Sequence, residues 1–297
     1  MEQPHTLPSR WRWRSSLAKL AGLALWAVLP LLVGILLAFA LVPIPQVGII
    51  RIEDVIWPEN TAHWSELVER ARTDSRIRAV VLQVNSPGGS VTPTEEIYYR
   101  LLELRETKPL VVAIDDVAAS GGYYLAAAGD RIFAKPSSIV GNIGVINLLP
   151  SIDEQRFISE DYVSSGPFKF SGGSRGDYVR QLELAKLSFL EAVFAQRSAR
   201  LRADRQKLAG GEIFMGTQAL QLGLIDELGS NSTAIAKAAE LAHLRHYQVV
   251  DVSELVDEGK GQSERVPPAG EKGSVWQPGL YYLYIEPQAS HGLARRP

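Results

Sequence analysis

One long stretch without charge constrains this chain more than any other feature. No Asp, Glu, Lys or Arg occurs between Leu20 and Ile50, and residues 20–42 read LAGLALWAVLPLLVGILLAFALV. A helix needs about 20 consecutive apolar residues to cross a bilayer, and this run meets that length. A basic cluster precedes it, formed by Arg10, Arg12, Arg14 and Lys19. Because positive charge marks the cytoplasmic side, we predict one transmembrane helix over 20–42, with the N-terminus in the cytoplasm.

Two other interpretations of this run are weaker. A cleaved signal peptide would have a small-x-small site, and Ala38-Phe39-Ala40 provides one. The apolar core of a signal peptide has only about 7–15 residues, however, so the longer run favours a retained anchor. A buried helix of a soluble domain would normally carry a polar stripe, and this run carries none.

Composition excludes several classes of protein. The chain has 297 residues, 31 Lys and Arg against 33 Asp and Glu, and a net charge of −2, unlike a basic nucleic-acid-binding protein. It has no cysteine, which excludes a disulfide scaffold, a cysteine-ligated zinc site and a thiol nucleophile. Neither the Walker pattern nor GxGxxG occurs, so we expect no nucleotide cofactor and no metal.

The remainder alternates strand-like and helix-like segments. Ile77–Val84 and Leu110–Ile114 are nearly continuous apolar runs, typical of strands buried on both faces of an α/β sheet. A segment whose apolar residues recur at helical spacing lies between the two runs. This order of strand, helix and strand indicates crossover βαβ units. We also expect one long helix over Tyr178–Leu208 and a further strand near Gly279–Pro287. The predicted regions are 1–19, a cytoplasmic N-terminus; 20–42, the membrane helix; 43–256, the folded domain; and 257–297, a tail that is flexible at least over 257–275.

Three glycine-rich segments follow strand-like runs. They are Ser86-Pro87-Gly88-Gly89, Ala119-Ser120-Gly121-Gly122 and Gly141-Asn142-Ile143-Gly144. Taken singly, each is explained by the freedom of glycine in tight turns. Together they place backbone N–H groups at the ends of neighbouring strands.

Ser120 is the most specific of these positions because it lies between a buried strand and a predicted helix. A serine there can cap the helix, which is a purely structural role. It can also be a nucleophile, with the N–H of Gly121 directed toward the developing oxyanion. The N–H of Gly88 or Gly89, at the end of the neighbouring strand, is a candidate second donor.

A nucleophilic serine requires a base, and no histidine is well placed for that role. Asp115 and Asp116 lie near Ser120 in sequence, but without a histidine they make no triad. A lysine base is the remaining variant of this chemistry. Lys169 is the candidate, because aromatic and glycine neighbours favour its partial burial, and burial favours the neutral amine. Lys135 and Lys186 are the alternatives.

Four ordered motifs give this chain a family resemblance. SPGG, AASGGYYLAAAGDRIFAKPSSIVGNIGV, SSGPFK and GEIFMGTQALQLGLIDELG resemble the signal peptide peptidase A (protease IV) family of membrane-anchored serine proteases. The similarity extends over about residues 47–245 and best fits the short, single-domain form. It implies an α/β fold of the ClpP/crotonase-like type, built from repeated ββα units after one transmembrane helix.

The resemblance also implies roles for individual residues. Ser120 matches the family nucleophile and Lys169 the general base of a Ser–Lys dyad. Gly89 and Gly121 match the oxyanion donors, with Gly88 as the adjacent turn residue. Asn142 stands where members often have serine, and its side-chain oxygen can still accept a hydrogen bond from the lysine.

Partners and location follow from the same resemblance. It implies a homo-oligomeric ring in which a neighbouring subunit can supply the base, and remnant signal peptides as substrates. It also implies an inner-membrane protein whose catalytic domain faces the periplasm. Two alternatives are a catalytically silent membrane scaffold of the same fold and a crotonase-like enzyme acting on acyl thioesters.

Overall fold

The chain forms two units, residues 1–44 and residues 45–297. The computed structural model describes residues 22, 24–41, 43–148, 165–169, 171–257 and 279–283. The first unit contains the π-helical turn η1 (Ala24–Val28) and helix α2 (Leu29–Leu41). Among the described residues, no helix is both long and apolar enough to span a membrane. The transmembrane helix expected over 20–42, part of which lies outside the described residues, therefore stays a prediction.

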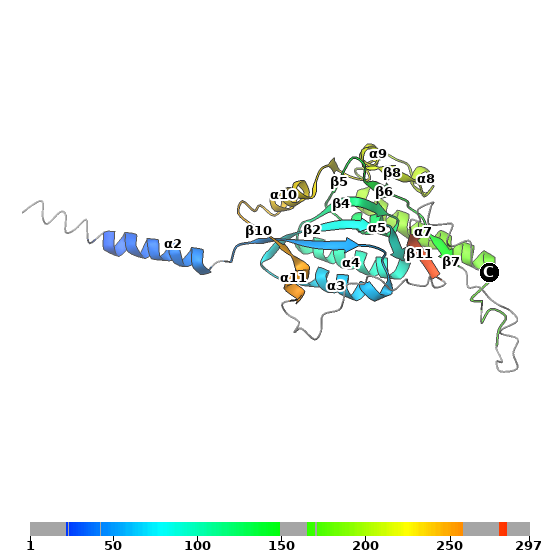
Figure 1. The fold of residues 1–297 in the computed structure, drawn as a ribbon, viewed down its shortest axis with the longest axis horizontal. Helices are drawn as coiled ribbons and strands as arrows, with labels where there is room; N and C mark the ends of the chain where they lie inside the picture. Colours follow the sequence, from blue (N-terminus) through cyan, green and yellow to red (C-terminus); the bar gives the residue numbers. More distant parts are fainter. Residues whose placement is uncertain are drawn as a thin grey trace, which may run out of the picture. The chain divides into compact units, whose positions relative to one another are not determined.

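The second unit is built on a mainly parallel sheet, which confirms the predicted α/β class (Figure 1). Its principal path runs β10-β1-β2-β4-β5-β9, and every pairing along that path is parallel. The six strands are β1 (Gln46–Glu53), β2 (Ile77–Ser86), β4 (Leu110–Ala119), β5 (Arg131–Ala134), β9 (Glu227–Leu228) and β10 (Gln248–Asp251). Two further strands extend it: β6 (Ile139–Gly141) pairs with the end of β4, and β8 (Ile213–Met215) pairs antiparallel with β6.

Helices cover both faces of the sheet because its central strands are apolar on both sides. In β2, Val80 and Leu82 belong to the larger core, whereas Ala79 and Val81 belong to the smaller one. The larger core packs against α3 (Pro58–Thr73), α4 (Val91–Thr107), α5 (Gly121–Ala126), α7 (Arg175–Arg197) and α11 (Val252–Asp257). The smaller core packs against α10 (Asn231–Leu241). The alternation of side chains along each strand thus creates two cores from one sheet.

The single helix predicted over Tyr178–Leu208 was wrong in its C-terminal part. Helix α7 ends at Arg197, and a separate short helix, α8, occupies Arg205–Leu208. The carboxylate of Asp204 accepts a hydrogen bond from the Lys207 N–H at 2.7 Å, which starts α8 as an N-cap does. Arg197 turns inward and is fully buried. Helix α9 (Gly216–Leu222) then ends at Gly223, which adopts the left-handed conformation typical of a helix C-terminus.

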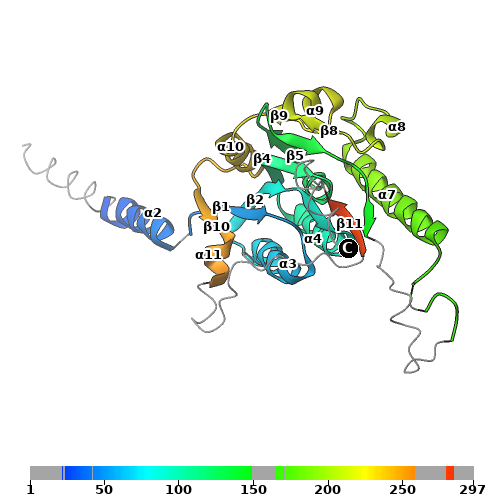
Figure 2. The ribbon, with the colours of Figure 1, turned by 45° about the vertical axis from the view of Figure 1, so that its right-hand side comes forward.

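A second, smaller sheet lies beside the ends of β2 and β4. It consists of β3 (Gly88–Ser90), β11 (Gly279–Leu283) and β7 (Ile146–Leu148), with β11 in the middle and antiparallel to both neighbours. Figure 2 shows β11 in red between the α4 region and the strand β7. The strand expected near Gly279–Pro287 therefore exists over its first five residues, and the later ones lie outside the described part of the chain.

Candidate active site

Ser120 occupies a strained turn between β4 and α5. Its backbone angles are φ 52° and ψ −118°, a region that residues with a side chain rarely adopt. The side chain is 1% exposed and does not cap α5, so the structural role considered for it is not observed. Its hydroxyl donates a long hydrogen bond of 3.4 Å to the carbonyl of Gly144. A strained serine on a strand-to-helix turn is the geometry of a nucleophile held for attack.

The two predicted groups of glycine donors lie next to each other. Gly88 has φ 103°, and a β-carbon placed on it would come within 2.6 Å of the Gly121 amide nitrogen. A β-carbon on Gly89 would overlap the carbonyl of Ile56, with which Gly89 forms a parallel bridge. The N–H of Gly88 donates to the buried hydroxyl of Ser86 at 3.2 Å. Backbone atoms of other segments lie so close to positions 88 and 89 that only glycine fits there, so these glycines do more than form a turn.

Lys169 makes no hydrogen bond to Ser120 among the described residues. It is exposed at the end of a short turn, where its backbone N–H donates to the Gly166 carbonyl at 3.3 Å. Its amine has no hydrogen-bond or ion-pair partner in the part of the chain that the structure describes, and so none in Ser120. Of the alternatives, Lys186 pairs with Glu183 on α7 at 2.7 Å.

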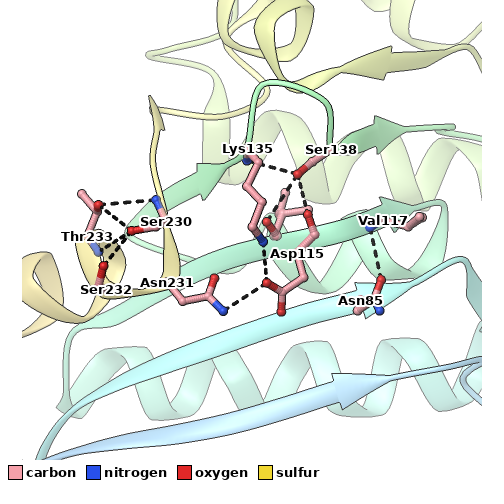
Figure 3. Close-up of polar contacts among 10 residues, drawn as sticks. Asn85, Asp115, Val117, Lys135, Ser138, Ser230, Asn231, Ser232 and Thr233 are labelled. Carbon is pink, nitrogen blue, oxygen red and sulfur yellow. Dashed lines mark hydrogen bonds and ion pairs between the residues drawn. The ribbon is translucent and has the colours of Figure 1, made fainter.

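Lys135, the other alternative, is engaged in a structural network (Figure 3). Its amine contacts Asp115 at 2.6 Å, and the Asn231 amide donates to the same carboxylate oxygen at 3.0 Å. The hydroxyl of Ser138 donates to the Asp115 carbonyl at 2.5 Å. These contacts join β4, the segment after β5 and the start of α10. Asp115 and Lys135 thus link the middle of β4 to α10 and make no hydrogen bond to Ser120 among the described residues.

Asn142 contacts the backbone rather than the lysine. It has φ 56°, and its side-chain amide donates to the Gly211 carbonyl at 2.7 Å. Its own N–H donates to the Glu212 carbonyl at 2.7 Å. In this arrangement Asn142 fixes the turn after β6 against the segment that leads into β8. The interaction expected between Asn142 and Lys169 is not formed within the described residues.

Sequence reasoning missed a cluster of aromatic rings that begins four residues after Ser120. Tyr124 of α5 contacts Tyr98 of α4 and Phe189 of α7, each with ring centroids 4.8 Å apart. All three are buried members of the larger core. Burial raises the pKa of the Tyr124 phenol, which keeps it neutral. The repeated tyrosines of GGYYLAAA were the only signal, and their spacing alone fits an ordinary core.

Comparisons with known proteins agree with this geometry. The family model "Clp protease" matches residues 46–140, and the model "Peptidase family S49" matches residues 103–245. Protease 4 of Salmonella typhi is 33% identical over 192 residues, which are 61% of this chain and 31% of that protein. A putative protease of Synechocystis sp. is 34% identical over 185 residues, 58% of this chain and 65% of that protein.

A third relative bears a different kind of name. The Na(+)/H(+) antiporter NhaA of Brucella abortus is 36% identical over 184 residues, which are 58% of this chain and 25% of that protein. Protease 4 and this antiporter are thus matched over about a third and a quarter of their own lengths. Their names describe chains much longer than the matched part.

The parallel-rich α/β sheet and the match of residues 46–140 to the Clp protease model are consistent with a ClpP-like fold. The match to peptidase family S49 extends over residues 103–245, just under half of the chain. The resemblance read from the SPGG, SGGYY and SSGPFK motifs is thereby confirmed.

Proposed function

We propose that this chain is a membrane-anchored serine endopeptidase with a Ser–Lys dyad, which degrades remnant signal peptides or other peptides at the membrane. The observation that carries the proposal is the strained, buried Ser120 beside the glycines of β3, in a chain that matches a peptidase family. A side chain held in an unfavourable backbone conformation is stabilised by the surrounding fold, and such strain concentrates at functional sites.

The reaction is an acyl transfer in two steps. Neutral Lys169 removes the proton from Ser120, and the serine oxygen attacks a peptide carbonyl. The N–H groups of Gly89 and Gly121 stabilise the oxyanion, at about 3 kcal/mol per donor. The tetrahedral adduct expels the amine as the lysine returns its proton, and an ester to Ser120 remains. Water, deprotonated by Lys169, then hydrolyses that ester.

This mechanism requires that the amine of Lys169 be buried away from solvent. A solvated ammonium keeps its proton, whereas burial favours the neutral amine that can act as a base. Phe168, next to it in the turn, is 51% exposed, and Leu184 on α7 is 65% exposed. Apolar exposure of this kind supports an assembly of several copies, in which a neighbouring subunit buries the turn and completes the dyad.

The apolar segment supports the location at a membrane. Trp26 and Leu36 of the first unit are 84% and 72% exposed, and no charged residue interrupts the run between Leu20 and Ile50. A lipid environment would cover these side chains. Anchoring would hold the site close to peptides left in the bilayer after preprotein cleavage.

The decisive test uses the detergent-solubilised full chain and a fluorogenic apolar peptide. Ser120→Ala and Lys169→Ala are each expected to lower kcat/KM at least 100-fold. Lys237→Ala is the matched control, since this lysine pairs with Glu240 on α10, and its activity should equal wild type. Hydrolysis that persists in Ser120→Ala would refute the nucleophile, and unchanged hydrolysis in Lys169→Ala would refute the base.

A further inference from the structure

A cavity of about 500 Å³ lies at the opposite end of β4 from Ser120. Pro109 and Arg131, where β4 and β5 begin, form part of its wall, and the C-terminal ends of α4, α7 and α10 border the rest. Strand β4 has 10 residues, so at about 3.3 Å per residue the cavity lies about 30 Å from the serine. It is therefore separate from the candidate active site.

Three arginines line this cavity, and the fold holds the first of them in place. Arg105 donates from Nη1 to the Ala128 carbonyl at 2.7 Å and from Nη2 to the side-chain oxygen of Gln196 at 2.6 Å. Both acceptors are uncharged, so these bonds fix the guanidinium without neutralising it. A carboxylate oxygen of Asp130 lies 3.9 Å from its Nε, at the limit of an ion pair. Arg105 is thus already oriented at the cavity wall, which lowers the cost of binding an anion there.

The charge of the other two arginines is largely uncompensated. Arg131 makes no side-chain hydrogen bond or ion pair with any residue that the structure describes. Arg200 lies 3.3 Å from Asp226, but the buried Arg197 binds the same carboxylate more closely, at 2.8 Å. Burial lowers the pKa of the Arg200 guanidinium, Asp226 offsets part of that change, and the other two arginines lower it further. A bound anion would relieve this excess of positive charge.

The charges that line the cavity suit a phosphate group. Three arginines stand against one lining carboxylate, that of Asp130, which leaves an excess of two positive charges. One oxygen of Asp130 already accepts the Leu110 N–H at 2.9 Å, at the start of β4. A phosphate monoester carries about −1.5 to −2 charges at pH 7, and guanidinium groups bind its oxygens through paired N–H donors. A cavity of this volume also has room for the group that the phosphate esterifies.

The cavity lies at the edge of the sheet where the chain enters the second unit. Strand β1 begins at Gln46 and is parallel to β2, β4 and β5, so the amino ends of all four strands share this edge. Only residues 43–45 separate β1 from the predicted membrane helix, at most about 14 Å of extended chain. The phosphate of a lipid headgroup is therefore one source of the ligand, and a soluble phosphate monoester is the other. The lipid source rests on the anchor proposed above, whereas the cavity does not.

We propose that Arg105, Arg131 and Arg200 form a binding site for a phosphate monoester, carried by a lipid headgroup or by a soluble molecule, at the end of the sheet remote from Ser120. This site goes beyond the peptidase function and does not depend on it. A purely structural role suits Arg105, since a basic side chain in the last turn of α4 interacts favourably with the helix dipole. Arg131 lies on a strand and has no such role, so it separates the two interpretations.

The first arm of the test measures binding of labelled glycerol 3-phosphate to the full chain in an uncharged detergent by equilibrium dialysis. Arg131→Gln and Arg200→Gln should each weaken binding at least tenfold, the loss expected of one charged, hydrogen-bonded contact. Arg100→Gln is the matched control, because this arginine pairs with Glu96 on α4 at 2.7 Å and does not line the cavity. It should bind like wild type, and so should Ser120→Ala.

The second arm distinguishes the two sources by thermal unfolding. Micelles that contain phosphatidic acid are compared with micelles that contain phosphatidylcholine, and each with added glycerol 3-phosphate. A ligand that binds only the folded state raises its Tm. A rise with phosphatidic acid in wild type and Arg100→Gln, absent in Arg131→Gln, assigns the lipid headgroup. The same pattern with glycerol 3-phosphate alone assigns a soluble ligand.

Other outcomes would overturn the site. Neither compound may bind, or Arg131→Gln and Arg100→Gln may weaken binding equally, which would indicate attraction to net charge alone. If Arg131→Gln unfolds at a lower temperature without ligand and binds like wild type, Arg131 serves stability and no anion. Intact binding in a chain that hydrolyses no peptide would refute the peptidase function and leave this site standing.

Discussion

Strain at Ser120 predicts an unusual outcome when glycine replaces it. A residue with a β-carbon in a sparsely populated backbone region costs about 1–3 kcal/mol, and glycine at φ 52° avoids that cost. Glycine also gives the unfolded chain more freedom, which lowers stability by about 0.5–1 kcal/mol. The hydroxyl contributes little, because its contact with Gly144 is 3.4 Å long. Ser120→Gly should therefore be about 1 kcal/mol more stable than Ser120→Ala.

The assay compares thermal unfolding of the two full-length variants in one detergent. A gain of 1 kcal/mol corresponds to a rise in Tm of about 2–4 °C for a domain of this size. Ser65 provides the control, since it lies inside helix α3. In the helix, Ser65→Gly should be about 1 kcal/mol less stable than Ser65→Ala, which is the opposite order to that expected at position 120. If Ser120→Gly is less stable than Ser120→Ala, in the same order as at position 65, the turn is not strained. The argument from strain for a nucleophilic Ser120 then fails.

Two further predictions concern stability away from the serine. Arg197→Leu should cost about 2–3 kcal/mol in urea unfolding, because the fully buried Arg197 binds Asp226 at 2.8 Å and its loss leaves that carboxylate with the weaker contact to Arg200 at 3.3 Å. The exposed Arg205→Leu should cost under about 1 kcal/mol, and equal costs would contradict the argument. Hydrogen bonds from Arg76 lower the pKa of Asp74 from 3.8 to about 2, so Asp74→Asn should lose about 1–2 kcal/mol of unfolding free energy at pH 7. The difference in unfolding free energy between wild type and this variant should shrink as the pH falls from 4 through 2, because Asp74 becomes protonated. A difference that stays constant over this range would refute the assignment.

The central sheet could be predicted because its strands are fully buried. The run Ile77–Val84 lies inside β2, and Leu110–Ile114 is the first half of β4, because strands covered on both faces must be apolar at nearly every position. The short strand β3 was not predicted, for the opposite reason. β3 reads Gly-Gly-Ser, and such a sequence signals a turn, whereas here the partner β11, remote in sequence, makes it a strand.

The candidate site shows the same division. That Ser120, Gly88 and Gly121 lie close together could be predicted because they sit at strand ends, which meet at one edge of a parallel sheet, whereas their roles stay predictions. The position of Tyr282 beside these glycines was not predicted, because no local sequence pattern indicates that β11 pairs with β3. The position of Lys169 relative to the serine depends on packing beyond its own turn, so spacing in sequence carries no information about it.

The strain at Ser120 persists because the helix that follows cannot move. All six residues of α5 are buried, and a β-carbon on Gly122 would overlap the carbonyl of Ser86, so the helix lies directly on β2. The Tyr123 hydroxyl donates to the Leu224 carbonyl at 2.8 Å, and the Ser120 N–H donates to the Gly141 carbonyl at 2.8 Å. Contacts from three distant segments, at Ser86, Gly141 and Leu224, thus fix the turn from both sides. A serine that only capped a helix would need none of these contacts, so the surrounding fold, and not the helix alone, holds Ser120 in its strained conformation.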